Sequence, residues 1–403
     1  MLQGKNRGIY IHIPFCRSKC PYCDFYSTPR HTPALREAFV RALEREIAYY
    51  GKAWRAHKDK PVDKPVESIY FGGGTPSLLD EAQLERLMER IREYFTIEDG
   101  AEISMEANPA TVTAEKLAAY RKAGLSRLSI GAQSFDSRVL KILGRVHSPA
   151  QIEEAFLASR EAGFENISLD LMFGIAGQSQ ESWENSVKSV IRLAPEHVSL
   201  YSLEIMDNTR FAKEHEAGIY RETEESEDRR MYERALEMLE GAGYLQYEIS
   251  NAANPGYACR HNLRYWNMGE YLGLGPSAHS FIDGVRYANA ADLEGYIEAM
   301  TAADAAEEMN TKIPLSPAVT DAYENTEQDN LSEYLFTGLR KNEGISKEAF
   351  RRTFGRELWA CFPDGKKEFE AFVSAGFAKE DAEGIRLTRA GMDISNKIMM
   401  IFV

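Results

Sequence analysis

The first half of the chain alternates between two patterns of apolar and polar positions. Short runs of β-branched and aromatic residues predict strands at Gly8–Ile13, Val66–Phe71, Glu102–Glu106, Arg127–Gly131, Ile167–Met172 and His197–Leu203. Apolar residues at helical spacing predict helices at Pro33–Tyr50, Glu81–Tyr94, Ala114–Ala123, Ser148–Ala162 and Ser182–Leu193. Because strands and helices alternate, we expect an α/β fold with a parallel sheet, closed into a partial (β/α)6 TIM-like barrel.

In such a fold the functional loops follow the carboxyl ends of the strands. A cysteine-rich loop follows the first predicted strand and a glycine run follows the second. Glu106 ends the third strand, and Gln133 follows the fourth. We therefore expect these polar groups to meet on one face of the barrel.

The pattern changes after the sixth predicted strand. A long helix is expected at about Glu224–Ala242, a Gly-, Asn- and Tyr-rich region follows at Tyr247–Ala288, and the polar stretch Ala302–Asn330 predicts a connection. The last part, Leu331–Val403, has helices before a short hairpin and resembles a winged-helix-like α+β domain, which we interpret as a module without chemistry. We divide the chain into a barrel core (1–240), an extension with a linker (241–330) and a C-terminal domain (331–403).

Composition narrows the class of protein. The chain has 403 residues, 44% of them hydrophobic and 27% charged, which is ordinary for a globular protein. The formal net charge of −14 argues against a nucleic-acid partner, because such partners need a basic surface. We see no apolar run long enough to span a membrane and no signal pattern at the start, so we expect a cytoplasmic protein.

The most informative motif is Cys16, Cys20 and Cys23, spaced C-x3-C-x2-C. Three thiolates this close can hold three irons of a [4Fe–4S] cluster and leave the fourth iron open to a small molecule. A structural zinc site would need a fourth ligand, and the remaining cysteines, Cys259 and Cys361, lie far away in the sequence. Five cysteines in a chain of this length also argue against a disulfide framework.

The triad closely resembles the cluster motif of the radical S-adenosylmethionine (radical SAM) proteins, in which the open iron binds SAM. The loop Gly72–Pro76 lacks the Lys of a phosphate-binding loop and is similar to the glycine loop of these proteins. Over nearly its full length the chain resembles the coproporphyrinogen III oxidase-like members of that superfamily. The stretches that carry this resemblance are Gly8–Ser27, Ser68–Pro76, Glu102–Pro109, Leu128–Phe135, Ser168–Gly177, His197–Glu204 and Cys259–Phe281.

The resemblance implies two cofactors, a [4Fe–4S] cluster on the three cysteines and SAM beside it. The positions implied to contact SAM are Tyr10, Tyr22, Gly73, Gly74, Thr75, Glu106, Gln133, Arg145 and Asp170. In this scheme Glu106 and Asp170 bind hydroxyl or amino groups, and the planar fork of Arg145 pairs with a carboxylate. Taken singly, each of these residues could equally form an ordinary salt bridge, cap or core contact.

A second stretch, His261-Asn262-Leu263-Arg264-Tyr265-Trp266, has the pattern H-N-x-x-Y-W of a heme-chaperone branch of the family. The resemblance implies a heme site at His261, Asn262, Tyr265 and Trp266, since His is a frequent heme ligand and aromatic rings offer flat apolar surface. Cys259 is a competing ligand and His279 a second choice. A lone His beside aromatic residues is otherwise more often part of a core.

Two functions follow from the resemblance. The first is a heme chaperone that delivers heme to accepting proteins, with membrane respiratory enzymes as candidate acceptors and a homodimer as a candidate assembly. The electron donor and the fate of SAM stay open. The alternative is an oxygen-independent coproporphyrinogen III dehydrogenase that forms protoporphyrinogen IX. The dehydrogenases carry a further cysteine where this chain has Phe25, and a longer segment before the position of Tyr10. We therefore favour the chaperone and expect that the dehydrogenase activity is lacking.

Overall fold

The structure is a computed structural model that describes residues 6–56, 64–302 and 313–403. At its centre lies a curved sheet in which six neighbouring strands, β1 to β6, run parallel. Their bounds are β1 Arg7–Ile13, β2 Val66–Gly73, β3 Ile97–Ala107, β4 Arg127–Gln133, β5 Ile167–Phe173 and β6 His197–Ser202. All six strands were predicted from the sequence, and the α/β barrel-like fold is confirmed.

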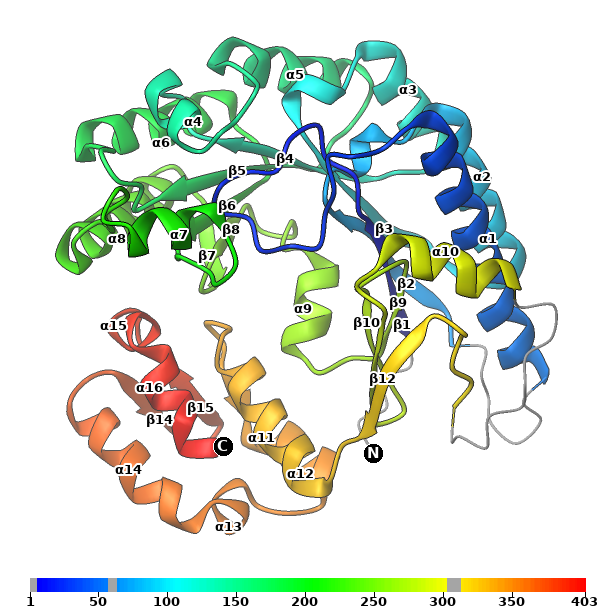
Figure 1. Cartoon of the computed structure of the whole chain (residues 1–403). Coiled ribbons are helices and arrows are strands. Elements are labelled where there is room, and N and C mark those ends of the chain that lie inside the picture. The colour runs from blue at the N-terminus through cyan, green and yellow to red at the C-terminus, as the bar shows by residue number, and fades with distance from the viewer. Residues whose placement is uncertain (1–5, 57–63, 303–312) are drawn as a thin grey trace.

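Helices cover the convex face of this sheet, as Figure 1 shows. Their bounds are α1 Pro33–Ala56, α2 Glu81–Tyr94, α3 Ala114–Ala123, α4 Ser137–Ile142, α5 Pro149–Glu161, α6 Gln180–Leu193 and α8 Glu225–Gly241. Helix α7 (Arg210–Glu216) lies instead by the cysteine-rich loop, where Phe211 N–H donates to Pro21 O at 2.8 Å. Aliphatic residues of the strands are buried against them in one continuous core. The short helices α4 and α7 were not predicted, because a helix of six or seven residues shows too little periodicity.

The segment predicted as an extension builds both edges of the same sheet. Strands β8 (Asn251–Ala253) and β7 (Leu245–Glu248) continue antiparallel from β6. At the other edge β9 (Tyr271–Leu274) pairs parallel with β1. Antiparallel strands then follow, namely β10 His279–Ile282, β11 Val285–Asn289 and β12 Val319–Glu324. These strands have three to six residues, which is too short for a clear alternation in the sequence.

Two further helices belong to this segment. Helix α9 (Arg260–Trp266) lies on the concave side of the sheet, whereas α10 (Leu293–Ala302) packs against α1 (Figure 1). The expected irregular connection Ala302–Asn330 contains β12 and the start of α11, and its part at 303–312 lies outside the described residues. This segment therefore adds one more strand, β12, to the sheet before the C-terminal domain begins.

The C-terminal domain has a hydrophobic core of its own around Leu335, Phe350, Phe369, Ile385 and Phe402. Its helices are α11 Glu327–Gly338, α12 Lys347–Phe354, α13 Leu358–Cys361, α14 Pro363–Ser374, α15 Arg389–Asp393 and α16 Ser395–Met399. Three short strands form its sheet in the order β13 (Ile345–Ser346), β15 (Gly384–Leu387), β14 (Ala378–Glu380). The predicted hairpin near Gly384 is therefore present.

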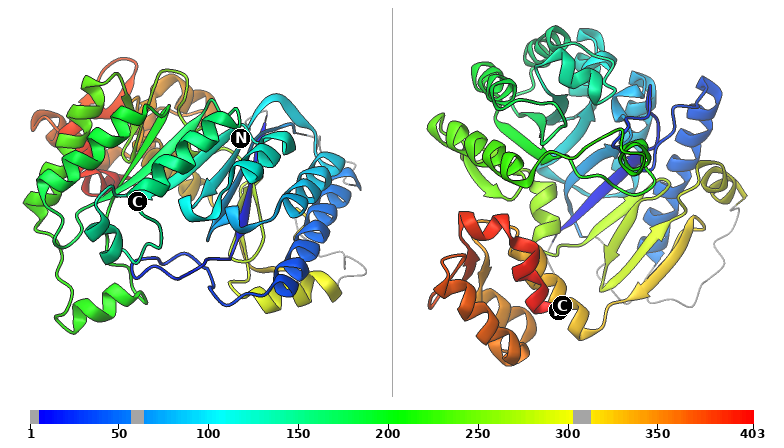
Figure 2. Two further views of the ribbon diagram at one scale, coloured as in Figure 1. Left: turned by 90° about the horizontal axis from the view of Figure 1, so that it is seen from above. Right: turned by 60° about the vertical axis from the view of Figure 1, so that its left-hand side comes forward.

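This domain lies below the concave side of the barrel, next to α9 and α8 (Figures 1 and 2). An ion pair between Arg229 of α8 and Asp393 of α15 joins the two parts. None of the helices within the described ranges is long and apolar enough to cross a membrane.

Candidate functional site

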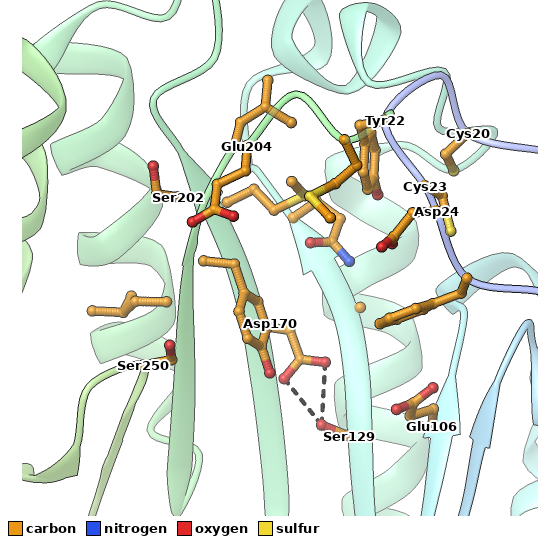
Figure 3. Close-up of a pocket in the computed structure, with 18 of the residues that line it drawn as sticks. Cys20, Tyr22, Cys23, Asp24, Glu106, Ser129, Asp170, Ser202, Glu204 and Ser250 are labelled. Atoms are coloured by element: carbon orange, nitrogen blue, oxygen red, sulfur yellow. Dashed lines mark hydrogen bonds between the residues drawn. The ribbon is translucent and has the colours of Figure 1, made fainter. Parts of the chain in front are cut away.

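The three cysteines lie on the loop that follows β1, and their thiols line one cavity of about 840 Å³ (Figure 3). Backbone hydrogen bonds shape this loop: Cys16 N–H donates to Thr28 O at 3.0 Å and Thr28 N–H donates to Pro14 O at 2.7 Å. Each thiol is partly exposed and none is in a disulfide. The sequence prediction that Cys16, Cys20 and Cys23 face one site is thereby supported.

The surroundings of the thiols suit an iron–sulfur cluster. Thr75 Oγ1 lies 3.6 Å from Cys16 Sγ and Arg145 Nη1 lies 3.8 Å from Cys20 Sγ, so both sulfurs have donors that stabilise a thiolate. No three His, Cys, Asp or Glu side chains of the described residues converge as they would on one metal ion. A cubic cluster does not require this, because each cysteine binds a different iron.

The glycine loop after β2 allows the cysteine loop to come close. Gly74 has no room for a side chain, since a Cβ there would lie 2.7 Å from Phe15 O and 3.1 Å from Cys16 Sγ. Gly73 has a φ of +106°, which favours glycine, and it faces the ring of His12. Gly73, Gly74 and Thr75 all line the cavity next to the cysteines.

Two carboxylates face this cavity, Glu106 near the end of β3 and Asp170 in the middle of β5 (Figure 3). Burial, and then the neighbouring charge of Asp170, raise the pKa of Glu106 to about 7. Burial also raises the pKa of Asp170, although Ser129 Oγ donates to both of its oxygens at 3.0 and 3.1 Å. Paired acids with raised pKa values favour a ligand that brings positive charge and hydroxyl donors.

SAM has both of these features, a sulfonium and an amino group for charge and ribose hydroxyls as donors. Tyr70, which was not singled out from the sequence, donates from its hydroxyl to Glu106 Oε1 at 3.0 Å and orients that carboxylate. The residues present therefore fit SAM, with Glu106 and Asp170 as acceptors.

Arg145 and Gln133 complete this end of the cavity. Arg145 Nη2 donates to Gly131 O at 3.0 Å, and its side chain reaches Cys20. The ladder between β4 and β5 shifts register before Gln133, whose φ of 65° re-aims the side chain. Tyr22 also lines the cavity.

Tyr10 does not belong to the cavity wall. Its ring stacks on Tyr70 with centroids 6.3 Å apart, and its hydroxyl lies 3.1 Å from His12 Nδ1. The structure thus places Tyr10 behind Tyr70, which lines the cavity, and a position of Tyr10 near SAM stays a prediction.

His261 on α9 also lies behind this wall, with 1% of its surface exposed. Its Nδ1 lies 2.9 Å from Ser68 Oγ and its Nε2 lies 2.9 Å from Tyr265 Oη, so both ring nitrogens have partners. The ring stacks on Tyr70 at 5.3 Å, and burial lowers the pKa of His261 to about 3. In this arrangement both ring nitrogens are engaged within the fold, and the heme-ligand role of His261 stays a prediction.

The two alternative heme ligands named from the sequence, Cys259 and His279, also lie outside the cavity wall. Cys259 is fully buried, its Sγ donates to Glu102 Oε1 at 3.5 Å, and burial raises the pKa of its thiol to about 12. A thiol of that kind is not the thiolate that binds iron. His279 is exposed on β10, and neither His279 nor Asn262 lines the cavity.

Trp266 faces the C-terminal domain instead of the cavity. The guanidinium of Arg340, just after α11, lies over its ring at 4.5 Å from the centroid. Arg340 itself lines the cavity, together with Met392, Asp393, Ser395 and Asn396 of the same domain. The prediction that this domain carries no chemistry missed these residues, because nothing in the sequence indicates that a segment 300 positions away folds back over the barrel.

Comparison with known proteins agrees with this geometry. Residues 10–190 match the radical SAM superfamily, whose cofactors are a [4Fe–4S] cluster and SAM, and residues 325–394 match the HemN C-terminal domain. The structure of coproporphyrinogen III oxidase (HemN) from Escherichia coli superposes with a TM-score of 0.82 at 24% identity, covering 99% of this chain and 91% of that one.

Curated relatives extend the match to the whole chain. The heme chaperone HemW of Bacillus subtilis is 35% identical over 98% of this chain and 99% of its own length. HemW of Lactococcus lactis is 30% identical over 100% of this chain and 98% of its own length. HemW of Escherichia coli is 38% identical over 69% of this chain and 71% of its own length. The chain therefore belongs to the HemW family within the radical SAM superfamily.

Proposed function

We propose that this protein is a heme chaperone, which binds heme and transfers it to heme-accepting proteins, with membrane respiratory enzymes as the candidate acceptors. The observation that carries the proposal is the end-to-end similarity to HemW relatives, which includes the C-terminal domain. A cavity of about 840 Å³ between the cysteine loop and that domain offers the space for a large ligand.

The cysteine end of the cavity serves the cofactors. When bound, the cluster and SAM supply one-electron chemistry. Cys16, Cys20 and Cys23 hold the cluster, while Glu106 and Asp170 accept from the amino and hydroxyl groups of SAM. Arg145 lies against Cys20 and can also bind the SAM carboxylate.

The H-N-x-x-Y-W helix acts from behind the cavity. His261 supports Tyr70, which orients Glu106, and Trp266 supports Arg340. In the proposal, these residues and Asn262 and Tyr265 shape the heme site.

Anaerobic reconstitution with iron, sulfide and heme tests the function. We expect the loaded protein to bind about one heme and to transfer it to an apo-acceptor, measured by the loss of its own Soret band and the gain of the acceptor's. Size-exclusion chromatography with and without heme tests whether a homodimer forms.

The dehydrogenase is tested on the same preparation. Incubation with dithionite, SAM and coproporphyrinogen III is expected to give no protoporphyrinogen IX. Formation of that product, or a reconstituted protein that binds no heme, would contradict the chaperone proposal.

A further inference from the structure

The cavity has a second end, formed where the barrel meets the C-terminal domain. Ile249, after β7, donates its N–H to Arg340 O at 3.2 Å, so the two parts touch at this point. Ser250, next to Ile249, lies across the cavity from the cysteine loop in Figure 3. Apolar surface is present here as well, from Met392, Ile249 and Phe173.

Arg340 is the unusual side chain of this end. Within the described part of the chain its guanidinium forms no ion pair or side-chain hydrogen bond, and its Nε is buried without a partner. Arg229, which lines the same cavity, differs because it pairs with Asp393. Because Arg340 is half-buried and lines the cavity, a ligand there can form the charge-assisted hydrogen bonds that the fold does not make.

Glu248 interacts electrostatically with Arg340 but forms no hydrogen bond or ion pair with it, and Glu248 Oε2 is itself buried without a partner among the described residues. Burial raises the pKa of Glu248, and Arg340 opposes that shift through space. The carboxylate of Glu248 nevertheless takes its side-chain hydrogen bond from Asn251. Arg340 therefore keeps its donors for another partner.

The indole ring of Trp266 packs against the guanidinium and limits where it can lie. The guanidinium Cζ lies 4.5 Å from the ring centroid of Trp266, a cation–π arrangement. An arginine side chain presents a planar fork of N–H groups that matches a carboxylate in two parallel hydrogen bonds. The ligand chemistry that fits this end is thus an anion with planar oxygens attached to an apolar body.

We propose that Arg340 binds a propionate carboxylate of heme and that Trp266 is a positioning residue that limits where the guanidinium can lie. This inference rests on the proposed function and deepens it by locating one contact with the cargo. The carboxylate of SAM has the same chemistry, but the arginine that lies against the cysteine loop is Arg145, beside Cys20.

The test compares heme with heme dimethyl ester, whose propionates are blocked. Soret titrations of the reconstituted full-length protein give both affinities. We expect wild type to prefer heme by on the order of tenfold, the worth of a charge-assisted hydrogen bond. Arg340→Gln should remove this preference, Arg340→Lys should keep part of it, and Trp266→Ala should reduce it several-fold. The affinity for the ester should stay the same in every variant.

Arg352→Gln is the matched control, since it removes the same charge from an exposed site on α12 of the same domain. SAM binding, measured by equilibrium dialysis, should not change in Arg340→Gln. A loss of SAM affinity would instead assign the carboxylate to SAM. An equal loss for heme and ester would show a structural role and overturn the inference.

The wild-type comparison needs no variant, so the inference stays testable if Arg340→Gln does not fold. Equal wild-type affinities for heme and its ester would overturn it while leaving the chaperone function intact. A protein that binds neither would overturn both.

Discussion

The two ends of the cavity are built in different ways. At the cysteine end, the functional groups follow the carboxyl ends of neighbouring parallel strands, so strand register brings Glu106 directly opposite Ser129. At the domain end, Arg340 and Met392 come from a separately folded unit with its own core. The comparison shows that one end is preorganised by the sheet, whereas the other depends on how the domains dock.

Removal of the three thiols should have the largest effect, because it abolishes cluster binding at one end of the cavity and tests whether heme binding at the other end is independent of it. The triple variant Cys16→Ala, Cys20→Ala, Cys23→Ala should lose all cluster absorbance after reconstitution, because no other thiol lines the cavity among the described residues. Heme affinity, measured from the Soret band, should change less than about threefold. A large loss of heme binding would show that the ends are not independent.

The carboxylates should affect SAM far more than heme. Asp170→Asn removes a charged acceptor, and we expect SAM affinity to fall by about ten- to a hundredfold, in line with 1.5–3 kcal/mol for such hydrogen bonds. Equilibrium dialysis of the reconstituted protein measures this. Asp381→Asn, which alters an exposed acid of the C-terminal domain, is the control and should leave SAM affinity unchanged.

His261 tests whether the H-N-x-x-Y-W helix ligates heme or supports the wall. His261→Ala leaves Ser68 and Tyr265 without a partner and should lower the free energy of unfolding by about 2 kcal/mol, measured by urea denaturation. The matched variant His279→Ala changes an exposed His and should have little effect. Loss of the heme-iron spectrum in His261→Ala without loss of stability would support the ligand role.

In the cofactor-free protein, Glu106 makes the free energy of unfolding depend on pH. Its pKa of about 7 lies above its ordinary value of 4.5, so the folded state loses stability as pH rises between these values. Glu106→Gln removes the charge, and we expect it to stabilise the cofactor-free protein by about 1–2 kcal/mol at pH 8 and by much less at pH 4. Urea denaturation at both pH values measures this; an equal effect at both would contradict the assigned cause.

The smallest effect is expected at Phe25, which is 59% exposed on the cavity rim. Phe25→Cys restores the residue type of the dehydrogenases. We expect no protoporphyrinogen IX in the anaerobic assay and a stability change within about 0.5 kcal/mol, as for other surface positions. Product formation would show that this one position separates the two functions.

The sequence predicted the cysteine end well, because each of its groups sits in a local motif next to a strand. The order of the parallel strands is enough to predict that four of these residues lie together, namely Cys16, Cys20, Glu106 and Asp170. Tyr70 was missed since an aromatic residue inside a strand looks like core, and Arg340 was missed since domain docking leaves no local pattern. The sequence could not show that His261 is buried and that Ser68 and Tyr265 engage both of its ring nitrogens, because these contacts join separate segments of the chain.

The ion pair between Arg229 and Asp393 crosses the junction that also forms the cavity wall. A molecule that touches both parts adds its binding energy to the docked arrangement, by thermodynamic linkage. Bound cargo would therefore stabilise the docked arrangement of the two parts, and separation of the parts would in turn weaken the binding of the cargo. An acceptor that weakens this junction would take up heme without competing for the iron.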